Sequence, residues 1–178
     1  RELATDARRF ANVLAQLGVQ RGERVASLMG RVPPLYATVL GTLAAGAIYC
    51  PLFSAFGPEP VKSRLVLGSA RVLVTTDLLY RRKVAPIRGE VPELRHVLVV
   101  RTPGAGDLPD GTLDFDELVR NASTDFETAP TTAEDFALLR GDPVHGDAEE
   151  TPHLLQPDAL HPLGWSARRS ALEAGRLL

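Results

Sequence analysis

The run VASLMGRVPPLYATVLGTLAAGAIYCPL, residues 25–52, decides the fold class because it holds a strand, a helix and a strand in order. Val25–Met29 is a short apolar run of strand length. Pro33 follows closely, and proline is well tolerated in the first turn of a helix. Ala47–Leu52 is a second apolar run of strand length. The stretch therefore predicts a βαβ unit with two parallel strands.

The helix inside this unit has one apolar face. Val39, Leu40 and Leu43 follow Tyr36 by three, four and seven residues, which places all four on one side of a helix. Gly46 stands where a glycine commonly ends a helix. We therefore expect the helix to end just before the second strand begins.

The same alternation continues on both sides of the unit. Upstream, apolar residues at helical spacing predict an amphipathic helix that ends at Gly18; they are Leu3, Ala7, Phe10, Leu14 and Leu17. Downstream, the sequence predicts helices at Gly57–Gly68 and Phe115–Val119, strands at Arg71–Thr75 and His96–Val100, and the start of a strand at Phe136–Leu139. Strands that alternate with helices predict an α/β protein: a partial doubly wound, mostly parallel sheet with helices on both faces.

Two changes of composition mark the organisation of the chain. Residues 102–112 are rich in Gly, Pro and Asp, which predicts a surface loop. After residue 139 the periodic pattern is lost, and a weak helical period returns only near residues 167–178. We therefore divide the chain into an α/β part, residues 1–139, and an atypical tail, residues 140–178. Asp77 is a candidate cap for a short helix, and Thr131 or Thr132 is another candidate cap.

Composition excludes several classes of protein. The formal net charge of the 178 residues is -2, and the 20 Lys and Arg residues are spread along the chain, so we expect no nucleic-acid partner and no membrane partner. Cys50 is the single cysteine, so no internal disulfide can form, which suits the cytoplasm. No apolar run approaches the roughly 20 residues needed to span a bilayer. The chain begins at Arg1 within a helical pattern, which suggests further sequence upstream.

Four segments together carry a resemblance to a known family. They are RFANVLAQLGVQRGERVA (residues 9–26), PPLYATVLGTLAAGAIYCPLFSAFGPEPVKSRL (33–65), ARVLVTT (70–76) and TTAEDFALL (131–139). In this order they resemble the N-terminal part of the AMP-forming acyl-CoA synthetases. The run PLFSAFGPE (51–59) looks most like the acetyl-CoA synthetases.

The resemblance implies a reaction and its cofactors. Such enzymes join a carboxylate such as acetate to ATP with Mg²⁺, release pyrophosphate, and pass the acyl-adenylate to coenzyme A. In the family, a loop rich in Ser, Thr and Gly and ending in Pro-Lys-Gly binds the triphosphate, directly after the strand matched by residues 136–139. Here RGDPVHGDAEE (140–150) follows, with no lysine and no glycine-rich nest. No catalytic residue is therefore carried over, and the chain resembles a fragment that we expect to be inactive alone.

One explanation of this departure is a frameshift near Leu139. With GC-rich codons, residues 145–149 read one nucleotide later give Thr-Gly-Thr-Pro-Arg, close to the family's Thr-Gly-x-Pro-Lys. A divergent loop is the alternative. The tail also holds His145, His153 and His161, but these are widely spaced and no cysteine accompanies them, so we expect no metal site.

Part of a coenzyme A site lies within the matched segments. The resemblance places the nucleotide pocket of coenzyme A at the residues after the second strand, and its ribose 3′-phosphate at the basic residues after the third. The implied cofactor-binding residues are Phe53, Ser54, Ala55, Arg81, Arg82, Lys83 and Val84. The alternative interpretation of the basic residues is a solvated helix end, where cations also suit the helix dipole.

These observations leave three functional hypotheses. The chain is a fragment of an acetate-CoA ligase, a noncatalytic α/β module that binds coenzyme A, a nucleotide or a partner protein, or an unstable product of a pseudogene. Half of a sheet should leave an unpaired edge that the missing remainder of the domain would cover.

Overall fold

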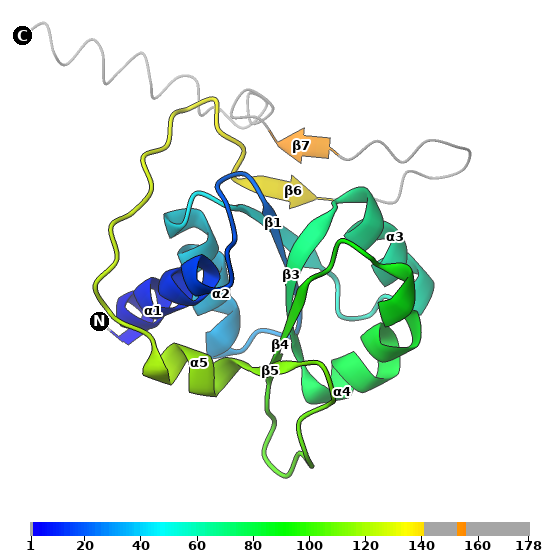
Figure 1. The fold of residues 1–178 in the computed structure, drawn as a ribbon. Helices are drawn as coiled ribbons and strands as arrows, with labels where there is room; N and C mark the ends of the chain where they lie inside the picture. The colour runs from blue at the N-terminus through cyan, green and yellow to red at the C-terminus, as the bar shows by residue number, and fades with distance from the viewer. Residues whose placement is uncertain (1, 141–152, 156–178) are drawn as a thin grey trace, which may run out of the picture.

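Residues 2–140 and 153–155 are described in a computed structural model, which shows a central sheet between helices (Figure 1). The expectations for most of the tail, including the frameshift, the weak helical period, His145 and His161, lie outside the described residues. Among the described residues, no helix is both long enough and apolar enough to cross a bilayer.

The sheet has seven strands in the order β5-β4-β3-β1-β2-β6-β7. All neighbouring strands pair in parallel except β6 and β7, which are antiparallel. The strands are β1 (Arg24–Leu28), β2 (Ile48–Leu52), β3 (Ala70–Thr76), β4 (His96–Val100), β5 (Leu113–Asp114), β6 (Leu138–Arg140) and β7 (His153–Leu155). The mostly parallel sheet confirms the predicted α/β class, although the two-residue strand β5 was not predicted.

Helices connect these strands and cover both faces of the sheet (Figure 1). They are α1 (Glu2–Gln16), α2 (Pro33–Ala44), α3 (Pro58–Leu67), α4 (Asp77–Leu79), the π-helical turn η1 (Tyr80–Val84), the 3-10 helix η2 (Ala85–Glu90) and α5 (Phe115–Asn121). The predicted starts and ends of α2 and α3 are confirmed, since Pro33 opens α2 and Gly57 and Gly68 flank α3.

Alternation along the strands divides the core into two layers. Side chains of a strand point alternately to opposite faces. Val72 and Val74 of β3 therefore pack with α1 and α5, whose Phe10 and Phe115 rings lie 5.5 Å apart between centroids. Leu73, between the two valines, packs on the other face with α3, η1 and η2. A strand with apolar residues at successive positions is thus explained by helices on both sides.

Helix α2 places its larger apolar side chains outward. A Cβ built on Gly41 would lie 2.6 Å from the Ala7 carbonyl oxygen and 2.9 Å from the Phe10 ring, so α1 and α2 cross closely there. The outer face carries Tyr36, Leu40 and Leu43, which are between 37% and 49% exposed. The predicted apolar face exists, but the smaller residues on the opposite side make the inward contact.

Strand β6 joins the sheet beside β2 through a short contact. Tyr49 is the one β2 residue paired with β6, and its N–H donates to the Ala137 carbonyl at 3.0 Å. Amide directions alternate along a strand, so the next donor toward β6 would belong to residue 51. Pro51 has no N–H. Pro51 lies one residue before the end of β2, and it limits the ladder on this side.

Candidate functional site

The carboxyl ends of the parallel strands are the first place to look for a site. In open α/β sheets, ligands bind outside the carboxyl ends of the strands, where the strand order reverses. The order reverses around β1 here, because β2 lies on one side of it and β3 on the other. The loop after β2, residues 53–57, and the turn after β3, residues 77–84, therefore flank the expected crevice.

A lysine joins the two segments that the resemblance assigns to coenzyme A. The Lys83 ammonium donates a hydrogen bond to the Ser54 carbonyl oxygen, with a distance of 2.5 Å between Nζ and O. The two residues are 29 positions apart in the sequence. The fold therefore brings residues 53–55 and residues 81–84 to one place, as a shared site requires.

Aromatic contacts support the loop after β2. The Phe53 side chain is 64% exposed. It meets the Phe56 ring edge-on, with the centroids 5.6 Å apart and the planes at 85°. The Arg64 guanidinium of α3 lies 4.3 Å from the centroid of the Phe56 ring, a distance at which a cation is attracted to the ring face. Phe56 is therefore held from both sides, and Phe53 stands at the surface.

The basic residues after β3 have different surroundings. Arg81 donates from Nη2 to the Asp107 carbonyl oxygen at 2.7 Å. Arg82 is exposed, and it forms no hydrogen bond or ion pair with any residue in the described part of the chain. Val84 is fully buried in the core under α3, so its side chain packs and does not reach a ligand.

An aspartate ties the end of β3 to the end of β4. Asp77 Oδ1 accepts hydrogen bonds from the Thr102 backbone N–H at 3.1 Å and from the Thr102 hydroxyl at 2.7 Å. Burial acts to raise the pKa of Asp77, but these bonds outweigh it, and the pKa lies below its ordinary value. Thr76, not Asp77, caps α4, since its hydroxyl accepts from the Leu79 N–H.

Several supporting residues were missed from the sequence. Phe56, Arg64 and Thr102 stabilise the loops but belong to no motif that we identified. The Phe-x-x-Phe spacing of residues 53 and 56 was the available signal for an aromatic pair. The Asp77–Thr102 contact joins residues 25 positions apart and had no local signal.

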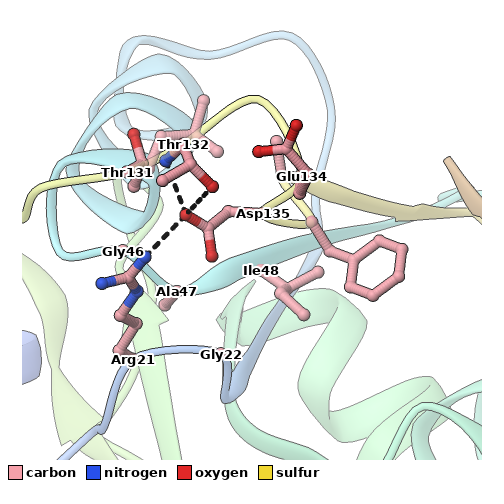
Figure 2. A pocket seen from close by; sticks show the side chains of 12 residues that line it. Arg21, Gly22, Gly46, Ala47, Ile48, Thr131, Thr132, Glu134 and Asp135 are labelled. Carbon is pink, nitrogen blue, oxygen red and sulfur yellow. Dashed lines mark hydrogen bonds and ion pairs between the residues drawn. The ribbon is translucent and has the colours of Figure 1, made fainter. Parts of the chain in front are cut away.

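A hollow with a volume of about 420 Å³ lies at the opposite edge of the sheet. It is lined by residues before β1, at the start of β2 and before β6 (Figure 2). Arg21 Nη2 lies 2.6 Å from Asp135 Oδ2, and the same oxygen accepts from the Thr132 N–H at 2.6 Å and from its hydroxyl at 3.1 Å. The Thr132 N–H and Arg21 hold the pKa of Asp135 below its ordinary value.

The polar groups of this hollow serve to anchor the chain before β6. No helix begins at Thr131 or Thr132, so the predicted cap is wrong: the aspartate side chain closes a turn instead. The Ala129 N–H also donates to the Ala44 carbonyl at the end of α2, at 2.8 Å. Arg21, Thr132 and Asp135 satisfy one another, which favours a structural role for this edge.

The single cysteine has no part in the candidate site. Cys50 lies in β2 and is 7% exposed. Burial raises the pKa of its thiol to about 12, so the thiolate needed for nucleophilic chemistry is not formed at neutral pH.

Comparison with known proteins gives a consistent result. The sequence profile described as AMP-binding enzyme matches residues 1–140. Acetyl-coenzyme A synthetase of Bacillus subtilis (strain 168) is 37% identical over 142 residues, which cover 78% of this chain and 24% of that protein. Acetyl-coenzyme A synthetase of Escherichia coli (strain K12) is 32% identical over 147 residues, covering 76% of this chain and 22% of that protein.

Solved structures agree with the sequence relatives. An acyl-CoA synthetase from Brucella canis superposes with a TM-score of 0.76 at 32% identity, covering 91% of this chain and 28% of that one. MatB from Rhodopseudomonas palustris superposes with a TM-score of 0.72 at 25% identity, covering 92% of this chain and 30% of that one. The chain thus spans about a quarter of the length of the curated relatives, 24% and 22% for the two above.

Proposed function

This chain belongs to the family of AMP-binding enzymes, and from that premise we propose that it is part of an acetate-CoA ligase. The reaction of the whole enzyme would convert acetate, ATP and coenzyme A into acetyl-CoA, AMP and pyrophosphate through acetyl-adenylate. The described residues would supply one wall of the coenzyme A pocket. The residues proposed to form it are Phe53, Ser54, Ala55, Arg81, Arg82 and Lys83, with Val84 packed beneath the turn.

The hydrogen bond between Lys83 and Ser54 carries this proposal. It joins the two segments at the carboxyl edge of the sheet, where the fold favours ligand binding. The edge also offers three consecutive residues with positive side chains, Arg81, Arg82 and Lys83. A phosphate monoester carries close to two negative charges at neutral pH and accepts several hydrogen bonds. Arginine and lysine supply both the charge and the donors that such a group requires.

Each proposed residue has its own part in this wall. Phe53 offers an exposed aromatic ring on which an adenine base can stack. Ser54 and Ala55 replace smaller residues at a position close to the ligand in the family. Val84 is buried and supports the turn from below.

The chemistry of adenylate formation is assigned to residues outside this part of the chain. Negative charge builds on the leaving pyrophosphate and must be met by fixed donors and cations. The sequence after residue 139 provides no lysine and no glycine-rich loop for that purpose. The residues that the structure describes also contain no cluster of His, Cys, Asp or Glu fit to hold Mg²⁺. No step that involves the metal is therefore assigned here.

Calorimetric titration of the chain with coenzyme A tests the proposal, together with an assay of ATP-pyrophosphate exchange. We expect saturable binding of coenzyme A and no exchange. Absence of binding by a chain that unfolds cooperatively would overturn the proposed pocket. Exchange activity would show that the adenylation machinery is present after all.

A noncatalytic α/β module that binds coenzyme A or a nucleotide is the second candidate. The missing phosphate loop favours it, because that loop is needed for adenylation but not for binding. Binding of coenzyme A without exchange is common to this candidate and to a ligase fragment. Restoring the rest of the ligase sequence after residue 139 separates the two: exchange activity should appear only if the chain is part of an enzyme.

A further inference from the structure

The outer face of α2 and the hollow at the amino edge form one apolar surface. Tyr36, Leu40 and Leu43 are exposed on α2 at spacings of four and three residues, so they form a stripe along the helix. Leu43 also lines the hollow, together with Ile48 of β2 and Phe136 before β6. A contiguous exposed apolar surface of this kind marks an interaction site.

The direction of β7 brings the next part of the chain to this surface. Leu155, the last residue of β7, pairs with Leu138, the first residue of β6. Because β6 runs parallel to β2, its first residue lies at the amino edge, directly after Phe136 and Ala137 of the hollow. Neighbouring strands lie about 4.8 Å apart. The chain therefore leaves β7 about one strand spacing from the rim of the hollow.

The segment that follows β7, residues 156–178, is long enough to cover the surface, and it lies outside the described residues. An extended chain spans roughly 3.3 Å per residue, so residues 156–165 can cross a hollow of about 420 Å³. Residues 167–178 carry the weak helical period. A helix of that length would be about 18 Å long, which matches the 12-residue α2.

The apolar residues of this segment suit the surface. Leu163 and Trp165 come just before the helical period, and Trp165 is the single tryptophan of the chain. An indole ring removes a large apolar area from water when a hollow encloses it. Within the helical period, apolar residues recur at spacings of four, three and four, which predicts one apolar face; they are Ala167, Ala171, Ala174 and Leu178.

The charges at the rim of the hollow are complementary to those of the segment. Glu134 is exposed there and forms no ion pair with any residue that the structure describes (Figure 2). Its neighbour Asp135 already pairs with Arg21. Arg168 and Arg169 follow the tryptophan by three and four residues. A segment that places its indole in the hollow therefore brings two cations close to the unpaired carboxylate.

We propose that residues 156–178 dock on this surface of their own chain, with Trp165 in the hollow. Arg168 and Arg169 lie beside Glu134, and residues 167–178 pack as a helix along the exposed stripe of α2, antiparallel to it. The segment completes the layer of helices on this face of the sheet. This role is separate from the proposed coenzyme A pocket, and coenzyme A titration does not decide it.

The fluorescence of the single tryptophan in the full chain tests the docking. In the wild type, the emission of Trp165 should be shifted to the blue and poorly quenched by acrylamide. Leu43→Glu should shift the emission to the red and raise the quenching constant several-fold, because it places a charge between the hollow and the stripe. Leu40→Glu, further along the stripe, should act in the same direction.

Leu67→Glu is the matched control for these variants. Leu67 is 45% exposed on α3, which covers the opposite face of the sheet, so the same substitution there should leave the emission and the quenching unchanged. All three variants replace exposed side chains, and urea unfolding followed by circular dichroism should show that they remain folded. Quenching that rises in L67E and not in L43E would place the segment on the other face and overturn the proposal.

Charge reversal tests the contact with Glu134. Glu134→Lys should raise the quenching constant, and adding Arg168→Glu and Arg169→Glu to the same chain should lower it again. Failure of the combined variant to regain protection would overturn the role of Glu134.

Two results with the wild type would overturn docking within one chain. The first is quenching of Trp165 as efficient as that of free tryptophan, which would show that the segment does not dock. The second is protection that disappears on dilution together with a dimer in sedimentation, which would show that a second copy supplies the segment.

Discussion

The two edges of the sheet each contain an aspartate that holds a loop, but the basic side chains at the two edges have different partners. At the amino edge, Arg21 pairs with Asp135, which also binds the turn at Thr132. At the carboxyl edge, Asp77 binds the neutral Thr102. Arg81 and Lys83 donate to backbone carbonyls, and Arg82 has no partner among the residues that the structure describes. A carboxylate pairs with the cation at the first edge, whereas residues 81–83 form no ion pair within the described part of the chain.

Polar residues can serve the structure at one edge and the binding of a ligand at the other. Opposite charges that satisfy each other stabilise a local shape and leave little to attract a ligand. A group of cations without acids raises the local concentration of anions and favours their binding. The hollow at the amino edge is therefore the better defined shape, yet the carboxyl edge is the better candidate site.

The largest expected effect on stability is at the amino edge. Gly46 has a φ of +69°, and an added Cβ would lie 3.0 Å from the Ala129 Cβ. Backbone strain of this kind costs about 1–3 kcal/mol, so we expect Gly46→Ala to lower the free energy of unfolding by about 2 kcal/mol.

Urea unfolding checks this prediction, with Gly89→Ala as the control. Gly89 has open space around its Cβ position and no positive φ. Its substitution should change the free energy of unfolding by less than about 0.5 kcal/mol. Equal effects of the two substitutions would show that the turn at Gly46 is not constrained by its neighbours.

We expect a smaller loss of stability when the aspartate at the carboxyl edge is replaced. Asp77→Ala removes the acceptor of two hydrogen bonds from Thr102. Because the side chain is partly exposed, we expect a loss of about 1 kcal/mol at most. Asp77→Asn keeps an oxygen at this position and should retain most of the stability in the same unfolding experiment. A similar loss in both variants would assign the effect to charge instead of hydrogen bonding.

The ion pair of the amino edge should appear in the pH dependence of stability. The folded pKa of Asp135 lies below its ordinary value of 3.8. Its contribution to stability is therefore present above the unfolded pKa and is lost as the pH falls through the lower folded pKa. The free energy of unfolding should therefore fall less between pH 7 and about pH 3 in Arg21→Met than in the wild type. An unchanged pH profile would contradict the pair.

The smallest expected effect has the opposite sign. Burial, and then the neighbouring charge of Asp114, raise the pKa of Asp116 above its ordinary value. The charged form is thus disfavoured in the fold, and this cost is present at pH values above the folded pKa. Asp116→Asn should increase stability slightly at pH 7, measured as a shift of the urea midpoint. Asp110→Asn, at an exposed position, is the control and should produce no shift.

The order of the elements was predictable from the sequence because it depends on local patterns. Glycine and proline marked the ends of α2 and α3, and the apolar runs marked β1 to β4. The inward face of α2 was not predictable from hydrophobicity, since the close crossing at Gly41 selects small residues over the larger Tyr36 and Leu40. Periodicity identifies an apolar face but does not say which neighbour it meets.

The candidate site was predictable only in part. The resemblance selected the two segments, but the contact between Lys83 and Ser54 depends on how two loops meet in space. The different surroundings of the three cations have the same origin, because Arg81 reaches the Asp107 carbonyl in a third loop. Local spacing carries no information about such contacts.

Pro51 has a consequence for the synthesis of the chain on the ribosome. Residue 138, whose strand covers this side of β2, follows Tyr49 by about 90 residues. At roughly 5–20 residues per second, the edge of β2 waits on the order of 5–20 s for its partner. An open strand edge can recruit another nascent chain during this time. The proline removes one donor from that edge, so it limits premature pairing while translation continues.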